Sequence, residues 1–244
     1  MGPEQLAILT LGVFVVAFLY SSVGHAGASG YIAVMTLLGM APAEIKPTAL
    51  VLNILVASIG ALQFFRAGHF SWQLFWPFAL LSVPLAWVGG YVSLPNQAFR
   101  MLVGAILFYS AARFVVGSPS GGRPLAPPRA AALAIGGGVG LLSGLTGTGG
   151  GIFLTPVLLL MNWATVKGAA AVSVVFILLN SISGLLGNVS STGTFPAFAL
   201  VPAVAAVVGG SVGSHLGSRR LEPLVIQRLL AVVLVIAGAK LLFF

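Results

Sequence analysis

Long apolar segments alternate with short polar ones along almost the whole chain. A helix needs about 20 residues to cross a bilayer core of ~30 Å. We predict eight segments long enough to do so, near residues 6–22, 47–66, 72–92, 97–116, 131–146, 167–187, 196–217 and 222–243. Two further apolar segments, near residues 30–41 and 151–162, are shorter, about 18 Å at the helical rise, and cannot span the bilayer alone.

The composition agrees with a membrane protein. Of the 244 residues, 59% are hydrophobic and 6% are charged, which is too apolar for a solvated surface. The segments lack the short alternation of an outer-membrane barrel, so backbone hydrogen bonding in lipid requires helices. The fold class predicted is all-α, a polytopic transmembrane helical bundle. The first apolar segment follows Met-Gly-Pro-Glu-Gln, which has no basic residue, and we expect a retained span rather than a signal peptide.

The charged residues are mostly basic, with a formal net charge of +8 and only three acidic residues, Glu4, Glu44 and Glu222. The positive-inside rule accounts for the excess, so no nucleic-acid partner is expected. Cation transporters usually hold their ions with intramembrane carboxylates, and the scarcity of acids disfavours that class. The chain has no cysteine, which excludes disulfides and thiolate metal sites. No cofactor or metal is expected.

The hydrophilic stretch "GSPSGGRPLAPPRA", residues 117–130, divides two similar halves. "VGHAGASGYIAVMTLL" begins at Val23 and "LTGTGGGIFLTPVLLL" at Leu145, and each is followed by a lysine and a long apolar helix. We predict a first transmembrane repeat over residues 1–116, a cytoplasmic linker over residues 117–130, and a second repeat over residues 131–244.

The distribution of basic residues favours five crossings in each half. With five, seven of them share one face and three the other: Arg66, Arg113, Arg123, Arg129, Lys167, Arg219 and Arg220 against Lys46, Arg100 and Lys240. If the short segments re-entered instead, the counts would be equal. The positive-inside rule therefore predicts two inverted-topology repeats of about five membrane segments, with both termini outside and the linker in the cytoplasm.

Each glycine-rich stretch precedes a short helix, and its backbone N–H groups would lie near the midplane with partial positive charge. This pattern predicts a two-sided site for a small anion, the glycines allowing close approach of the backbone. The alternative is that the glycines only let helices pack closely. The candidate residues of the two stretches are Gly24, His25, Gly27, Ser29, Gly30, Thr146, Thr148, Gly149, Gly150 and Gly151.

Four further polar residues are candidate substrate ligands. Lys46 and Lys167 hold matching positions after the short segments, where each could attract anions or snorkel to the interface. Asn53 and Asn180 lie in the long helices that follow, where amides also join helices together. His25 is the candidate for proton coupling, because its ordinary pKa is near neutrality.

With these motifs, "SSVGHAGASG" and "SGLTGTGGG" above all, the chain resembles the TauE/SafE family of membrane exporters from Leu9 to Leu242. The resemblance implies export of sulfite or an organosulfonate such as sulfoacetate across a bacterial inner membrane. Its implied partners are the small anionic substrate and the lipid bilayer. Nothing in the sequence predicts an oligomeric state.

Three other functions fit parts of the sequence. Gly27-Ala28-Ser29-Gly30 matches the G-x-S-G of intramembrane serine proteases, with His215 as a possible partner. We disfavour a protease, because the second stretch has no equivalent serine. A passive anion channel or an importer of the same fold remains an alternative, since sequence does not give direction. For a transporter we predict alternating access about an anion held between the two stretches.

Overall fold

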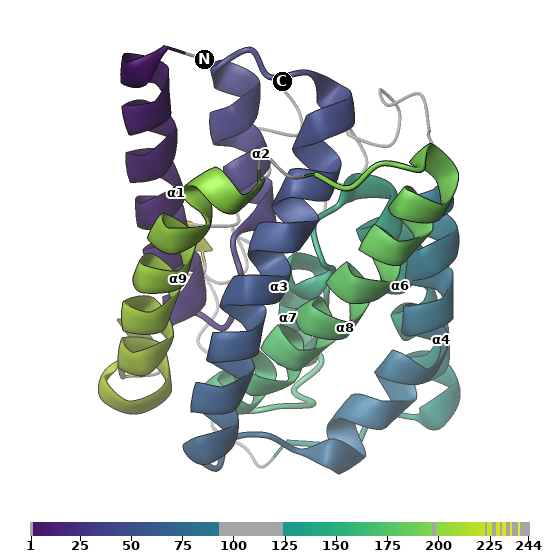
Figure 1. Ribbon diagram of the computed structural model, residues 1–244. Helices are drawn as coiled ribbons and strands as arrows, with labels where there is room; N and C mark the ends of the chain where they lie inside the picture. Colours follow the sequence, from purple (N-terminus) through teal and green to yellow (C-terminus); the bar gives the residue numbers. More distant parts are fainter. Residues whose placement is uncertain are drawn as a thin grey trace.

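The computed structural model describes residues 2–92, 124–196 and 199–222, and eight residues beyond: Leu224, Val225, Arg228, Leu229, Ala231, Val232, Val235 and Ala239. The predicted helix near residues 97–116, residues 117–123 of the predicted linker, and most of the predicted last helix lie outside the described residues. Within the described ranges the fold is a bundle of helices without a strand (Figure 1). The prediction of an all-α bundle is confirmed.

The described elements follow the apolar pattern of the sequence. They are α1 (Pro3–Ser22), α2 (Ala28–Leu37), α3 (Pro42–Arg66), α4 (Trp72–Tyr91), α6 (Arg129–Thr146), α7 (Gly151–Leu160), α8 (Val166–Thr192), α9 (Leu200–His215) and a π-helical turn (Leu216–Arg220). Six of these are long and apolar enough to cross a membrane: α1, α3, α4, α6, α8, and α9 with the π-helical turn. The chain is a multi-pass membrane protein by this criterion.

Two helices, α3 and α8, are longer by five residues or more than the sequence pattern predicted. α3 begins at Pro42 rather than near residue 47, because a proline in the first turn has no N–H to leave unpaired. Pro47, the sixth residue of α3, lies inside the helix and removes one helical hydrogen bond there. α8 continues to Thr192, where Gly193 ends it in the left-handed conformation with φ of 67°.

Contacts between helices fix their directions. Gly209 of α9 packs on Phe14 of α1, and Gly217, two turns on, packs on Ser22. α1 and α9 therefore run in parallel. We call the end of the bundle where α1 begins the Glu4 end, and the opposite end, where the π-helical turn lies, the Arg219 end; they are the top and bottom of Figure 1.

The same reasoning orients the other long helices. Gly136 and Gly144 of α6 pack on Phe78 and Ala86 of α4, so α4 and α6 are parallel. α3 runs from the Glu4 end to the Arg219 end, and α4, α6 and α8 return in the opposite direction (Figure 1). In each pair taken from the two halves, α1 with α6, α3 with α8, and α4 with α9, the helices run in opposite directions.

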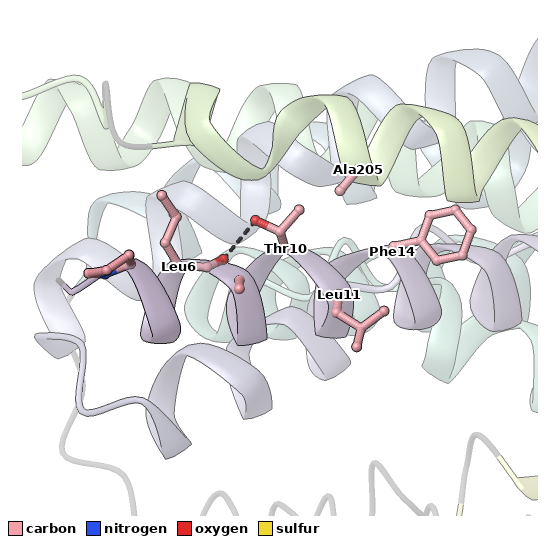
Figure 2. Close-up of a pocket in the computed structure, with 7 residues that line it drawn as sticks. Leu6, Thr10, Leu11, Phe14 and Ala205 are labelled. Atoms are coloured by element: carbon pink, nitrogen blue, oxygen red, sulfur yellow. Dashed lines mark hydrogen bonds between the residues drawn. The ribbon is translucent and has the colours of Figure 1, made fainter.

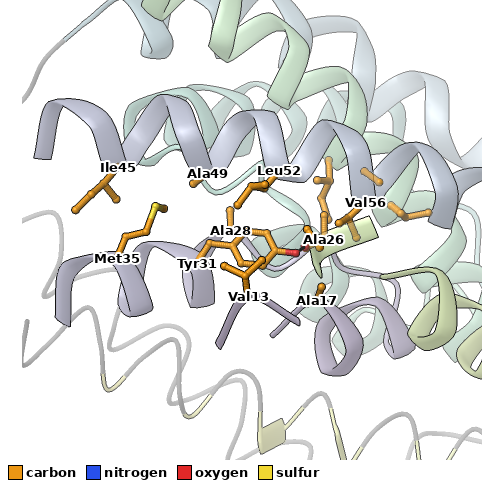
Figure 3. Packing of buried hydrophobic residues seen from close by; sticks show 14 of the residues in the cluster. Val13, Ala17, Ala26, Ala28, Tyr31, Met35, Ile45, Ala49, Leu52 and Val56 are labelled. Atoms are coloured by element: carbon orange, nitrogen blue, oxygen red, sulfur yellow. Dashed lines mark hydrogen bonds between the residues drawn. The ribbon is translucent and has the colours of Figure 1, made fainter. Parts of the chain in front are cut away.

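The two short helices each fold back beside the next long helix. α2 runs antiparallel to α3, with Met35 near Ile45 and Ala28 near Leu52 (Figure 3). α7 runs antiparallel to α8 and ends at the Arg219 end, where Leu125 N donates to Asn162 O at 2.8 Å. The short helices therefore begin inside the bundle and end at opposite faces.

Basic and acidic residues separate between the two ends. Glu4 and Glu44 lie in the first turns of α1 and α3, at the Glu4 end. Five basic residues lie where helices start or finish at the other end: Arg66, Arg129, Lys167, Arg219 and Arg220. These five belong to the set that the sequence placed on one face; Arg100, Arg113, Arg123 and Lys240 lie outside the described residues.

Candidate functional site

Two glycine loops with similar backbone geometry interrupt the bundle. The first glycine loop is defined as residues 23–29, which join α1 to α2 and include the first two residues of α2. The second is defined as residues 146–152, which join α6 to α7 and include the first two residues of α7. Gly24 and Gly147 have φ of 78° and 74°, and Gly27 and Gly150 have φ of 102° and 82°. These pairs, like the starts of α2 and α7, are 123 residues apart. Residues with side chains rarely adopt such φ values, which explains the glycines there.

Asn53 contacts both loops. It is fully buried and is the twelfth residue of the 25-residue α3, near the middle of the bundle. Its Oδ1 accepts a hydrogen bond from Ala28 N at 3.0 Å, at the start of α2. Its Nδ2 donates to Thr148 O in the second loop and to Ser181 Oγ of α8, each at 3.3 Å. One amide therefore joins the two glycine loops and α8.

His25 links the first loop to the second half of the chain. Its ring is buried, and Nδ1 lies 3.3 Å from Val23 O. Nε2 faces Thr155 Oγ1 of α7 at 3.4 Å. Thr155 Oγ1 in turn donates a hydrogen bond to Ser173 Oγ of α8 at 2.6 Å. His25 thus begins a buried chain of hydroxyl groups that crosses between the halves.

The serine of the first loop has a structural partner. Ser29 Oγ donates to Tyr20 OH at 3.0 Å, and Tyr31 OH donates to Ala26 O. His215 is exposed at the end of α9 near the Arg219 end, while Ser29 is buried. The structure does not bring these two residues together, and the dyad that a serine protease would need is not formed.

The second loop has several backbone donors without a partner. No described residue accepts a hydrogen bond from the N–H groups of Gly149, Gly150 and Gly151, all of which are buried. Beside them, Thr148 Oγ1 and Thr146 Oγ1 lie 2.8 Å apart, and Thr146 donates to Leu142 O. The three amides lie at the positive end of the α7 dipole, and such a group favours an anion.

The two lysines do not hold equivalent positions, contrary to the sequence prediction. Lys46 is the fifth residue of α3 and Lys167 the second of α8. Gly147 packs on Lys46, and its counterpart Gly24 packs on Ala170, so Ala170 is the structural match of Lys46. The sequence comparison paired the two lysines by their order after each short segment, whereas by helix position Lys167 corresponds to Ala43, the second residue of α3.

The side chain of Lys46 packs on Gly147 of the second loop, and its ammonium group donates hydrogen bonds to backbone oxygens. Nζ donates to Gly89 O at 3.4 Å and to Gly90 O at 3.2 Å, at the end of α4. A cation there is favoured by the negative end of the helix dipole. No carboxylate pairs with it among the described residues. Lys167, by contrast, lies at the Arg219 end, away from both loops.

Asn180 makes no hydrogen bond to either glycine loop within the described part of the chain. Ser82 Oγ of α4 donates to Asn180 Oδ1 at 2.7 Å, and Asn180 Nδ2 has no partner among the described residues. Asn180 therefore joins α4 to α8, as amides in membrane helices often do. The remaining candidates, Gly24 and Gly30, pack on Ala170 and Val16.

The sequence analysis missed polar partners that lie on other helices. Tyr20, Thr155 and Ser143 are buried near the loops, on the three helices α1, α7 and α6. Ser143 Oγ has no partner within the described part of the chain. The sequence contained a signal for two of them, because Ser143 begins the motif "SGLTGTGGG" and Thr155 lies in the second matched stretch.

A surface groove lies elsewhere on the bundle. It is formed by α1 and α9 near the Glu4 end, with Leu6, Thr10, Leu11, Phe14 and Ala205 in its walls (Figure 2). Its polar group, the Thr10 hydroxyl, donates to Leu6 O of its own helix at 2.7 Å. The groove is apolar and faces the lipid side, so it does not suit a small anion. Among the described residues no cluster of acidic and histidine side chains could hold a metal ion.

The apolar helices and the polar groups at mid-depth define a multi-pass membrane protein of the transporter class. The chain belongs to the sulfite exporter TauE/SafE family, whose model matches residues 9–241. The resemblance found in the glycine-rich motifs is thereby confirmed.

Two curated relatives carry transporter names. The chain is 42% identical, over the full length of both proteins, to "Probable membrane transporter protein y4hK" of Sinorhizobium fredii (strain NBRC 101917 / NGR234). It is also 30% identical to "Probable membrane transporter protein YunE" of Bacillus subtilis (strain 168), over 43% of this chain and 38% of that protein. No solved structure matches the chain. Family and relatives together support a membrane transporter rather than an enzyme.

Proposed function

We propose that the chain is a secondary transporter that exports a small sulfur oxyanion, sulfite or an organosulfonate such as sulfoacetate, across a bacterial inner membrane. The observation that carries the proposal is the group of buried backbone amides at the second glycine loop for whose N–H groups no described residue provides an acceptor. An anion can satisfy such amides without a charged side chain. The family supplies the class of substrate.

The proposed mechanism is alternating access of two inverted repeats. Its support is that matched helices of the two halves run in opposite directions and that the glycine loops meet at Asn53, near mid-depth. Asn53 and His25 hydrogen-bond across the two halves at this place, and in the proposed mechanism these bonds break and form again as one half moves against the other. The five basic residues at the Arg219 end favour a cytoplasmic location for that end.

Proton coupling is part of the proposal, with His25 as the coupling group. The chain of His25, Thr155 and Ser173 connects side chains that can donate and accept protons across the boundary between the halves. A rocking motion would separate Thr155 from His25. Protonation of the imidazole could then be linked to one of the two orientations.

The test is uptake of ³⁵S-labelled sulfite into inside-out vesicles that contain the protein, with and without an imposed proton gradient. We expect accumulation above that of vesicles without the protein, and a further rise when the gradient is imposed. Equilibration without accumulation under the gradient would indicate a passive channel. Absence of flux for both sulfite and sulfoacetate would contradict the proposed substrate class.

A further inference from the structure

The two glycine loops differ at the residue where the short helix begins. Ala28 N, at the start of α2, donates to Asn53 Oδ1. Gly151 N, at the start of α7, has no described acceptor. The amides of Ala26 and Gly27 lack a described acceptor just as those of Gly149 and Gly150 do, so over these three matched positions the two loops differ in this one amide. In both halves the twelfth residue of the next long helix lies at this place: Asn53 in α3, and Ile177 in α8.

Ile177 cannot replace the acceptor that Asn53 provides. Its side chain packs against the second loop, where a β-carbon added to Gly149 would lie 2.7 Å from Ile177 Cγ2. An aliphatic side chain accepts no hydrogen bond, so the amides beneath it stay unsatisfied in an apolar setting. Buried amides without a partner cost free energy, and a ligand that pairs with them recovers it.

The loops also differ in how much backbone they expose to a ligand. The second loop runs Gly149-Gly150-Gly151 where the first has Ala26-Gly27-Ala28. The Ala26 and Ala28 methyl groups are buried in the cluster around Tyr31 (Figure 3). The second loop carries no such methyl groups, and a side chain of α8 covers it instead: a β-carbon added at Gly149 would lie 2.7 Å from Ile177, and one added at Gly151 would overlap the same side chain. An oxyanion can approach these amides closely once Ile177 moves aside.

A buried hydroxyl group beside the second loop also favours a ligand at that loop. Ser143 is fully buried, and its Oγ has no hydrogen-bond partner among the described residues. Its β-carbon lies 3.2 Å from where a β-carbon on Gly150 would lie. The counterpart in the first half is Tyr20, whose hydroxyl is already paired with Ser29.

We infer that the transported anion binds at the second glycine loop alone, and that the Asn53 amide is a built-in ligand that fills the equivalent place in the first loop. The inference rests on the proposed function and replaces a two-sided site with a one-sided one. Ile177 then covers the site, and its side chain must move aside for the anion to bind. Asn53, which also donates to Thr148 O, positions the second loop without serving as its anion ligand.

The test measures binding of ³⁵S-sulfite to the purified full-length protein in detergent. We expect one anion per chain. Ile177→Asn, which gives the second loop the acceptor of the first, should weaken binding by about tenfold or more, as expected for a lost hydrogen bond to a charged group. The matched control is Ile182→Asn, the same change on α8 at a side chain that is 38% exposed. Ile177→Ala removes the covering side chain without adding an acceptor, so it should bind sulfite more tightly than the wild type, and this gain separates loss of the site from misfolding.

A second pair of variants compares the loops directly. Gly150→Ala and Gly27→Ala introduce a β-carbon at equivalent positions of positive φ, each 2.9 Å from a neighbouring ring carbon. Because the backbone strain is similar, thermal stability should fall by similar amounts. Sulfite binding should fall by about tenfold or more only in Gly150→Ala.

The outcomes distinguish this inference from the proposed function. Equal losses in Gly150→Ala and Gly27→Ala, two anions per chain, or unchanged affinity in Ile177→Asn would overturn the one-sided site while sulfite binding by the wild type stands. A wild-type protein that binds no sulfur oxyanion would overturn the proposed function and this inference with it.

Discussion

At the residue scale, single polar side chains hold the glycine loops in place. Asn53 bonds to the start of α2 and to the second loop, and His25 bonds to Thr155 of α7. Each bond crosses between elements that are distant in the chain. A polar group at this depth has no water to replace a lost partner, so removal of one side chain should be measurable.

Thr155→Val should destabilise the protein, because it removes the hydroxyl between His25 and Ser173 and keeps the shape of the side chain. We expect a loss of about 1–2 kcal/mol in the free energy of unfolding. Thermal unfolding in detergent, followed by circular dichroism, measures it. Thr10→Val is the control, because the Thr10 hydroxyl bonds only within α1. Equal melting temperatures for the two variants would contradict a stabilising role for the His25 chain.

At the element scale, close packing of small residues joins the helices. Gly136, Gly140 and Gly144 of α6 face the backbone of α4, and a β-carbon at any of them would overlap an α4 carbonyl. Close approach of backbones is the usual way that helices associate in lipid, where no hydrophobic force drives them together. This interface determines the position of α6 against α4. It therefore also determines where in the bundle the second glycine loop begins.

Gly140→Leu should prevent correct packing of α6 on α4. The added side chain overlaps Ser82, and we expect a loss of about 3 kcal/mol or more in stability. Size-exclusion chromatography and thermal unfolding of the solubilised protein measure it. Gly138→Leu is the matched control on the same helix, because nothing lies within 4 Å of its β-carbon position. A monodisperse, stable Gly140→Leu protein would contradict the packing.

At the scale of the whole molecule, charge is distributed along the bundle axis. Basic residues gather at the Arg219 end, and two of the three acidic residues, Glu4 and Glu44, lie at the other. Retention of basic residues on the cytoplasmic side during insertion would orient the bundle with the Arg219 end inside. The direction of the proposed transport is defined by that orientation.

Single-cysteine labelling tests the orientation, and the natural chain, which has no cysteine, is a clean background. Thr194→Cys, exposed in the turn after α8, should react with an impermeant maleimide added to intact spheroplasts. Arg220→Cys, exposed at the Arg219 end, should react only after the membrane is permeabilised. The reverse pattern would contradict the proposed orientation.

Much of the fold could be predicted from the sequence because lipid leaves the backbone few choices. Apolar length located the described helices, with errors of four or five residues at four boundaries: the end of α2 at Leu37, the start of α3 at Pro42, the end of α8 at Thr192 and the start of α9 at Leu200. The glycine stretches located the loops. The individual roles of the candidates could not be predicted: Asn180 and Asn53 look alike in the sequence, yet only Asn53 contacts the loops.

The sequence by itself determined that the chain is a helical membrane protein of the TauE/SafE family and where its backbone breaks, because both follow from local composition and motif. Only the tertiary structure decided which side chains meet at the breaks. The partners of Asn53 are 25, 95 and 128 residues away, and such contacts depend on how helices pack rather than on their own sequence. The difference between the loops, Asn53 on one and Ile177 on the other, emerges only when the two long helices are set side by side.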